Sequence, residues 1–541
     1  MGIPSYFSYI VKNHPAIIKK YVKNVLKVDN LYLDCNSIVY DAYNKIVFEN
    51  LTENVSISII KSVISKIEYY IKTIEPTRTV YIAFDGVAPV AKLDQQRSRR
   101  YKSWYQNDIS RKIFKKVNPD PWSTTAITPG TKFMNDLNIS ISDTFKKHNA
   151  IKYNVNNIIC SGSNIAGEGE HKIYEYIRKN PIKHASETTV IYGLDADLIM
   201  LSINHLPISP KIYLFRETPH FIGSINADLE PDQNYVMDIP ELSNAIIKYM
   251  NNDIELTTKQ QTNRIYDYIF LSFFLGNDFL PHFPTLNIRT GGIDKMLNAY
   301  KATIGNTDEN LTDGKTIFWG NVRKMLSFLE EREEEYYIVE HKLRNKRENK
   351  NMPEYTPEEK FKKFEAIPTY DRDIEYFINP VKPNWQKRYY KALFNFSEKE
   401  INEAKRKEVA INYLEGLEWT MKYYTSGCVD WRWKYRYNYP PLLSDLLSVT
   451  PVFEKQFLEI NNANPVSELV QLCYVLPRSN LNLLPSKLHN KLIQNYEHWY
   501  KNDCEYVWAY CRYFWESHVE MDDIDIDELE KFIKENRDLL N

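Results

Sequence analysis

Three apolar runs typical of β-strands each end in acidic residues, and two glycine-containing turns add further acids. Aspartate is a poor strand residue, and its charge is costly near a hydrophobic core, so folding alone does not explain this repetition. The pattern predicts ligands for a cation. The candidates are Asp34, Asp85, Glu168, Glu170, Asp195, Asp197 and Asp278.

The places of these acids indicate how they could act together. In open α/β sheets, ligands bind beyond the carboxyl ends of the strands, where side chains far apart in sequence converge. Carboxylates gathered there raise one another's pKa, so they stay ionised only beside bound positive charge. Oxygen ligands suit Mg²⁺, with Mn²⁺ as a substitute. We therefore expect two metal ions that activate a water and stabilise the leaving group of an in-line displacement.

Alternating strand-like and helical stretches must position the acids. The segment 55–74 repeats apolar residues at helical spacing, and a strand-like run over 80–84 follows it, as in a β-α-β unit. A helix expected over 170–178 places the two glutamates of the Gly-Glu-Gly-Glu turn at or just before its start, where glycine lets the backbone approach a ligand. The prediction is an α/β fold with a mainly parallel sheet flanked by helices.

A basic segment soon after Asp85 could bind phosphate. If the stretch 92–102 is helical, the three-and-four spacing places four polar side chains near one face: Lys92, Gln96, Arg99 and Arg100. Lysine supplies a point charge, arginine a bidentate fork and glutamine an amide donor. An ordinary exposed basic helix is the alternative. Together with a metal centre, a phosphate-binding helix indicates phosphodiester hydrolysis.

The stretch 431–439 mixes aromatic rings with cations, as single-stranded nucleic-acid sites do. Trp431 and Trp433 are the candidate stacking rings, and Tyr40, soon after Asp34, could supply another. Aromatic runs are more often part of a core than of a ligand site. For Tyr40, a place in the core is about as consistent with the sequence as a stacking role. Composition leaves both interpretations open.

Length and charge suggest two structural units. Single cores stop growing at roughly 250 to 300 residues, and this chain has 541. The highly charged stretch 330–368 is interpreted as a solvated helix that runs into a flexible linker. We place a nuclease catalytic region at 1–345, the linker at 346–372 and a second region at 373–541.

Composition excludes several other classes. The six cysteines are scattered without a C-x-x-C pair, which argues against a zinc site and for a reducing compartment. No apolar run approaches the roughly 18 residues of a membrane span, and the first residues lack the pattern of a signal peptide. We expect a soluble intracellular protein with no membrane contact. The net charge of -2 indicates no partner class.

The chain closely resembles the XRN family of 5′-to-3′ exoribonucleases. Several independent motifs occur in one order, which makes coincidence implausible. The segments that carry the resemblance are 1–4 (MGIP), 33–36 (LDCN), 84–89 (FDGVAP), 92–100, 128–131 (TPGT), 167–172 (GEGEHK), 192–197 (YGLDAD) and 276–281 (GNDFLP), with looser matches at 385–390, 416–419, 431–433, 475–477 and 483–485.

The resemblance implies specific roles. It implies a PIN-like or 5′-nuclease-like fold in which a second, mostly helical and aromatic-rich region closes the pocket. The seven acids would hold two Mg²⁺ ions, and the basic face would grip a 5′-monophosphate. The family sandwiches the first base between a histidine and a tryptophan; Trp433 matches the tryptophan, with Trp431 beside it, and Tyr40 replaces the histidine. Tyrosine keeps a stacking face and loses a possible cation. Ala166 replaces a usual proline, which should loosen that turn.

The substrate implied by the resemblance is single-stranded RNA with a 5′-monophosphate, cut processively to mononucleotides. Caps and triphosphates would be excluded. Decapping factors are candidate protein partners. Without a zinc knuckle or a long C-terminal extension, we expect a compact cytoplasmic form. The abundance of Lys, Asn, Ile and Tyr is typical of an AT-rich genome and favours a large DNA virus as the source. For a viral protein, we expect the host cytoplasm or a viral factory as the location.

Two other functions stay open. A structure-specific 5′ flap DNA nuclease shares the acid-cluster architecture and would prefer a DNA flap to RNA of the same sequence. A catalytically inactive RNA-binding scaffold would lack one of the acids, and none is missing.

Overall fold

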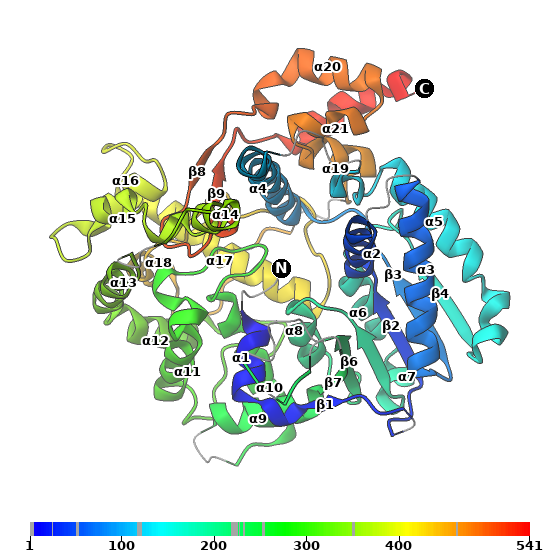
Figure 1. Cartoon of the computed structure of the whole chain (residues 1–541). Helices are drawn as coiled ribbons and strands as arrows, with labels where there is room; N and C mark the ends of the chain where they lie inside the picture. Colours follow the sequence, from blue (N-terminus) through cyan, green and yellow to red (C-terminus); the bar gives the residue numbers. More distant parts are fainter. Residues whose placement is uncertain are drawn as a thin grey trace.

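The protein is described by a computed structural model of the chain (Figure 1). The opening motif 1–4 lies outside the described residues. The structure describes residues 5–23, 25–49, 54–115, 122–217, 225–226, 228–230, 233–251, 255–348, 352–460 and 464–540.

Seven strands form the main sheet in the order β1-β7-β6-β5-β2-β3-β4. The five strands from β6 to β4 are parallel, whereas β7 runs antiparallel to both of its neighbours. The mainly parallel α/β sheet predicted from the sequence is confirmed. The strands are β1 (Ile18–Lys20), β2 (Asn30–Asp34), β3 (Thr79–Ala83), β4 (Asn157–Ser161), β5 (Thr189–Tyr192), β6 (Ile212–Glu217) and β7 (Asn234–Asp238).

Helices cover both faces of this sheet (Figure 1). Leu31 and Leu33 of β2 pack into a core with α2, α3 and α5, while Tyr32 between them points into the core of α6, α8 and α10. This alternation follows from the two-residue period of a strand. The bounds are α2 (Asn36–Phe48), α3 (Val55–Ile74), α5 (Lys132–Thr144), α6 (Gly169–Lys179), α8 (Asp197–Asn204) and α10 (Thr258–Phe273).

The strand order changes direction between β2 and β5. From β2 the chain adds β3 and β4 on one side, and then returns to add β5 on the other. Such a topological switch point is where open α/β sheets bind ligands. Asp34 is the last residue of β2, and Asp85 and Asp195 follow β3 and β5 at the same edge.

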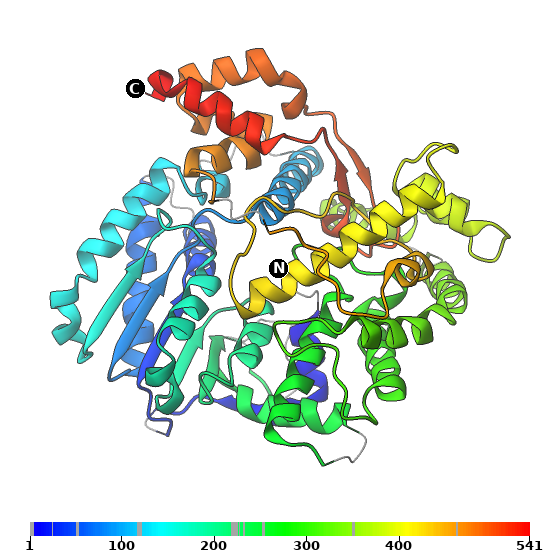
Figure 2. The same cartoon turned by 180° about the vertical axis from the view of Figure 1, so that it is seen from behind.

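A helical, aromatic-rich region packs against the sheet, as the sequence predicts. Its helix α17 (Glu403–Thr425) crosses the molecule (Figure 2) and shares one continuous core with α6, α8 and α10. A separate core unites α19, α20 and α21 with Leu93 near the start of α4. The bounds are α4 (Val90–Phe114), α11 (Gly292–Thr303), α12 (Trp319–Glu330), α16 (Trp385–Leu393), α18 (Leu443–Val449), α19 (Glu468–Val475), α20 (Ser486–Tyr496) and α21 (Ile526–Glu535).

The described residues of the charged stretch 330–368, which leave out 349–351, include two helices and a buried ion pair. Within α13 (Glu333–Glu348), Arg344 is buried, and its guanidinium donates to both carboxylate oxygens of Glu375, at 2.7 and 2.5 Å. A further helix, α14 (Pro357–Glu365), packs its aromatic side chains on α4. Buried ion pairs therefore account for part of the charge density. The domain division at 346–372 stays a prediction.

Two predictions from composition bear on the described residues. All six cysteines are free thiols. In the part of the chain that the structure describes, every helix is too short or too polar to cross a membrane.

Candidate metal centre and substrate site

Three carboxylates meet at the carboxyl edge of the sheet. Asp34, Asp85 and Glu170 each contribute one oxygen to a group whose members lie within 4.8 Å of one another. Oδ1 of Asp34 is buried and finds no hydrogen-bond donor among the described residues. A buried charged oxygen without a partner is costly, so this donor set fits a divalent cation.

Hydrogen bonds fix Asp85, and a glycine leaves space beside Asp34. Asn36 holds Asp85 twice, by donating from Nδ2 to Oδ2 at 2.5 Å and by accepting the Asp85 N–H at 3.0 Å. The N–H of Gly169 donates to the other Asp85 oxygen at 2.7 Å. A Cβ at Gly169 would lie 2.6 Å from Oδ1 of Asp34. Only glycine leaves that space free.

A buried lysine connects two of the four remaining acids. Nζ of Lys92 lies 2.7 Å from Oε1 of Glu168 and also pairs with Asp278, which accepts a second bond from Nε2 of Gln95 at 2.9 Å. Oδ1 of Asp197 is buried without a donor among the described residues. Lys92 thus lies among the acids, whereas the sequence argument placed it with the phosphate-binding side chains; its predicted role at a phosphate stays untested.

Burial and neighbouring charge shift the acids in opposite directions. Burial, with Glu168 beside it, raises the pKa of Asp85 to about 6. Burial, with Asp278 beside it, raises the pKa of Asp197 to about 7. Asp278 itself is different: burial raises its pKa, but Lys92, acting together with other positive charge that includes Arg99, holds that pKa well below the usual value. The metal-free site therefore holds protons near neutral pH.

We expect metal-free protein to lose stability as pH rises from about 4 towards 7. Asp85 and Asp197 have raised pKa values in the folded state, so the folded protein binds more protons than the unfolded chain over this window, and stability falls as pH rises. Mg²⁺ competes with those protons, so its stabilising effect should be larger at pH 8 than at pH 5.5. Thermal melts at both pH values, with and without Mg²⁺, test this. Equal Mg²⁺ shifts at the two pH values would contradict it.

The predicted phosphate side chains lie on α4. Arg99 is exposed, and Gln96 and Arg100 are half-buried. Nη1 of Arg100 is buried without an acceptor among the described residues, and burial lowers the pKa of Arg100 to about 10, an effect that nearby Tyr40 opposes. An arginine donor without a partner suits an anionic ligand.

Trp433 ends a stack of rings that begins beside the acids. The ring centroids are 5.1 Å apart from Trp433 to Trp419, 4.8 Å from Trp419 to Tyr423, and 3.8 Å from Tyr423 to His171. Trp433 is half-buried, so part of its surface stays accessible. Trp431 and Tyr40 are the two other candidate stacking residues. Neither takes part in a ring contact found among the described residues. Tyr40 is 43% exposed on α2.

Trp431 is half-buried, and its carbonyl accepts the Val90 N–H at 3.0 Å. This bond joins the aromatic stretch to the start of α4. Asp195 is exposed and lies near Asp34. Burial is the main cause that raises the pKa of Asp34, and the charge of Asp195 raises that pKa further. The structure thus brings the acids and the start of α4 together, while the ligand roles of these residues stay predictions.

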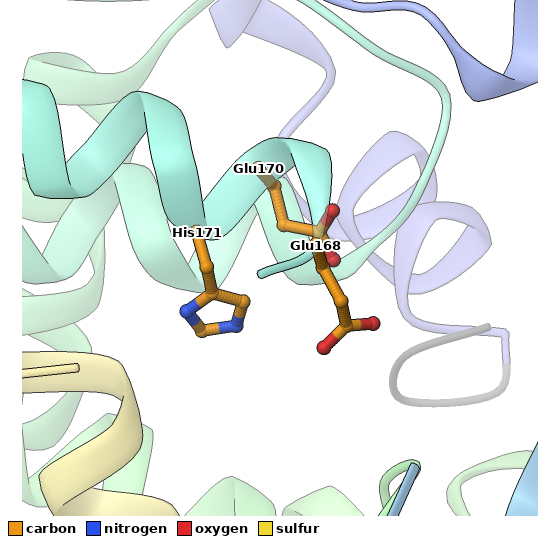
Figure 3. A group of neighbouring side chains, drawn as sticks. All are labelled: Glu168, Glu170 and His171. Atoms are coloured by element: carbon orange, nitrogen blue, oxygen red, sulfur yellow. The ribbon is translucent and has the colours of Figure 1, made fainter. Parts of the chain in front are cut away.

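The sequence argument assigned no role to Asn36, His171 or Tyr423. His171 lies beside Glu168 and Glu170 at the start of α6 (Figure 3), and one atom of each falls within 4.8 Å of the others. Asn36 and His171 stand inside motifs that carry acids, so their position was a usable signal. Tyr423 lies 255 residues from Glu168, to which its hydroxyl donates, and no local pattern connects them.

Comparison with known proteins gives consistent matches. The family model described as "XRN 5'-3' exonuclease N-terminus" matches residues 1–218, and the "Xrn1 helical domain" matches 259–373 and 369–540. Relatives include 5'-3' exoribonuclease 2 of Arabidopsis thaliana (25% identical) and 5'-3' exoribonuclease 1 of Saccharomyces cerevisiae (27% identical), each aligned over 90% of this chain. The chain spans 62% and 40% of the length of these two proteins.

Proposed function

Because this chain belongs to the Xrn family of 5'-3' exonucleases, we propose that it is a processive 5′-to-3′ exoribonuclease. Its substrate would be single-stranded RNA with a 5′-monophosphate, released as mononucleotides. The observation that carries the proposal is the buried carboxylate group at the sheet's switch point, with Asp34 lacking a donor for one oxygen. We place its action in the cytoplasm.

The chain's own residues divide the work. Two Mg²⁺ ions, or Mn²⁺ in their place, would supply an activated water and stabilise charge on the phosphate that is cut. The acids at the strand ends hold that centre. Arg100, whose Nη1 is unpaired among the described residues, donates to the 5′-phosphate, and Trp433 stacks on the first base. Fixing both ends of the first nucleotide sets the register of cleavage.

Two alternatives use the same site differently. A DNA flap nuclease would employ the same acids, but the relatives carry the name exoribonuclease, which favours RNA. An inactive RNA-binding scaffold is less well supported, since all seven acids are present and the centre retains a buried oxygen without a donor.

The deciding experiment compares 5′ ends. Purified protein with Mg²⁺ is given one RNA sequence bearing a 5′-monophosphate, a 5′-hydroxyl or a 5′-triphosphate, and a DNA flap of matched sequence. We expect rapid release of mononucleotides from the monophosphate RNA alone, because the phosphate pocket requires a small dianion. Equal degradation of the three RNAs would refute the pocket, and preference for the flap would establish the DNA alternative.

The same assay includes Arg100→Ala with a matched control. Loss of a charge-assisted hydrogen bond is worth about 1.5 to 3 kcal/mol, so preference for the monophosphate should fall by about tenfold or more. Arg111→Ala removes an exposed guanidinium further along α4 and should leave that preference unchanged. If both variants lose the preference equally, the general charge of the helix is responsible.

A further inference from the structure

We propose that Tyr423 is a positioning residue for the metal centre: its hydroxyl fixes the carboxylate of Glu168 before a cation binds. The inference rests on the proposed function for the role of Glu168. Tyr423 lies near the C-terminal end of α17, in the helical region, while Glu168 directly precedes α6 beside the sheet. The contact therefore joins two parts of the chain that meet at the site.

The hydrogen bond fixes one oxygen of Glu168. The Tyr423 hydroxyl donates to Oε2 at 2.8 Å, and Lys92 lies 2.7 Å from Oε1. Glu168 is buried, so water cannot replace a lost donor cheaply. Lys92 is itself a cation, so a metal ion that binds Glu168 would repel the lysine from that carboxylate. The Tyr423 hydroxyl is an uncharged donor, so a bound cation does not repel it and it can keep its bond when a cation arrives.

The ring of Tyr423 is held on three sides. His171 stacks on one face with an interplanar angle of 27°, and Trp419 stacks at 22° with its centroid 4.8 Å away. Phe279 meets the ring edge-on at 89°. A ring confined in this way has little rotational freedom, so its hydroxyl is a preorganised donor. Preorganisation lowers the free energy needed to order a ligand when the ion binds.

The column that confines Tyr423 continues to Trp433, where space is limited. A Cβ at Gly416 would lie 2.9 Å from Cη2 of Trp433, so the missing side chain gives Trp433 room to stack on Trp419. The proposed base-stacking ring and the donor to Glu168 therefore belong to one packed unit. This placement distinguishes Tyr423 from an ordinary core tyrosine.

Manganese binding to the RNA-free protein tests the inference. Mn²⁺ titrations followed by electron paramagnetic resonance give the affinity directly. Tyr423→Phe keeps the ring and removes the hydroxyl, so we expect Mn²⁺ binding at the Glu168 position to weaken by about tenfold or more. The Mg²⁺ concentration for half-maximal RNA cleavage should rise by a similar factor, while the KM for RNA stays unchanged.

Two comparisons separate positioning from general packing. Tyr389→Phe removes a similarly buried hydroxyl, which donates to the Pro440 carbonyl at 2.9 Å, and should leave Mn²⁺ affinity unchanged. In a Glu168→Gln background, Tyr423→Phe should cause no further loss, because it acts through that carboxylate. Wild-type affinity in Tyr423→Phe, or an undiminished loss in the double variant, would overturn the inference. If Mn²⁺ binding behaves as expected while the wild-type protein degrades no RNA, only the proposed function fails.

Discussion

Asp34→Asn is expected to lower the rate of RNA hydrolysis by a factor on the order of 10³, while RNA binding changes little. Asparagine keeps the shape of the side chain and removes its charge. Asp34 ends β2, the middle one of the five parallel strands, and its Oδ1 has no protein donor among the described residues. That oxygen is therefore available to the proposed cation. Single-turnover cleavage at saturating Mg²⁺ and fluorescence anisotropy of RNA binding measure the two effects.

Asp29→Asn is the matched control for this variant. Asp29 directly precedes β2, at the opposite edge of the sheet, where it accepts the Thr188 N–H at 2.9 Å and pairs with Arg78 at 3.3 Å. Its replacement should reduce stability slightly and leave the cleavage rate unchanged. Retention of more than a tenth of the rate in Asp34→Asn would contradict the assignment of Asp34 to the metal centre.

The convergence of the acids could be predicted because it follows from the topology. Acids at the ends of parallel strands share one edge whatever the chain does between them. Helix α3 spans 55–74, as its apolar spacing predicts, because that stripe faces one side of the sheet. These features depend on local periodicity and on strand polarity, both of which the sequence records.

Contacts between distant segments could not be predicted in this way. Helical spacing assigned Lys92 to a face with Arg100, but it does not tell how near the first turn of α4 lies to Glu168 and Asp278. The bond from Tyr423 to Glu168 depends on how α17 packs across the sheet. High charge in the sequence likewise does not distinguish a solvated helix from the buried ion pair of Arg344.

Gly169→Ala is expected to separate activity from stability. Gly169 is the first residue of α6, where the helical backbone accepts alanine, so we expect stability to change by no more than about 1 kcal/mol. The Cβ of alanine would nevertheless lie 2.6 Å from Oδ1 of Asp34 and 3.4 Å from Oδ1 of Asp85, beside the acids proposed to hold a cation. We expect cleavage to fall at least about a hundredfold, since small displacements of a reacting geometry have effects of this size. Thermal melting and single-turnover rates measure both quantities.

Gly291→Ala gives the opposite pattern and so serves as the control. Gly291 has a φ of 82°, which strains any other residue, but the nearest atom to its added Cβ lies 4.0 Å away. That variant should lose about 1 to 2 kcal/mol of stability and keep its cleavage rate. If Gly169→Ala also keeps its rate, the space beside Asp34 is not needed for catalysis. If it loses rate together with Mn²⁺ binding, the result supports a cation site beside Gly169.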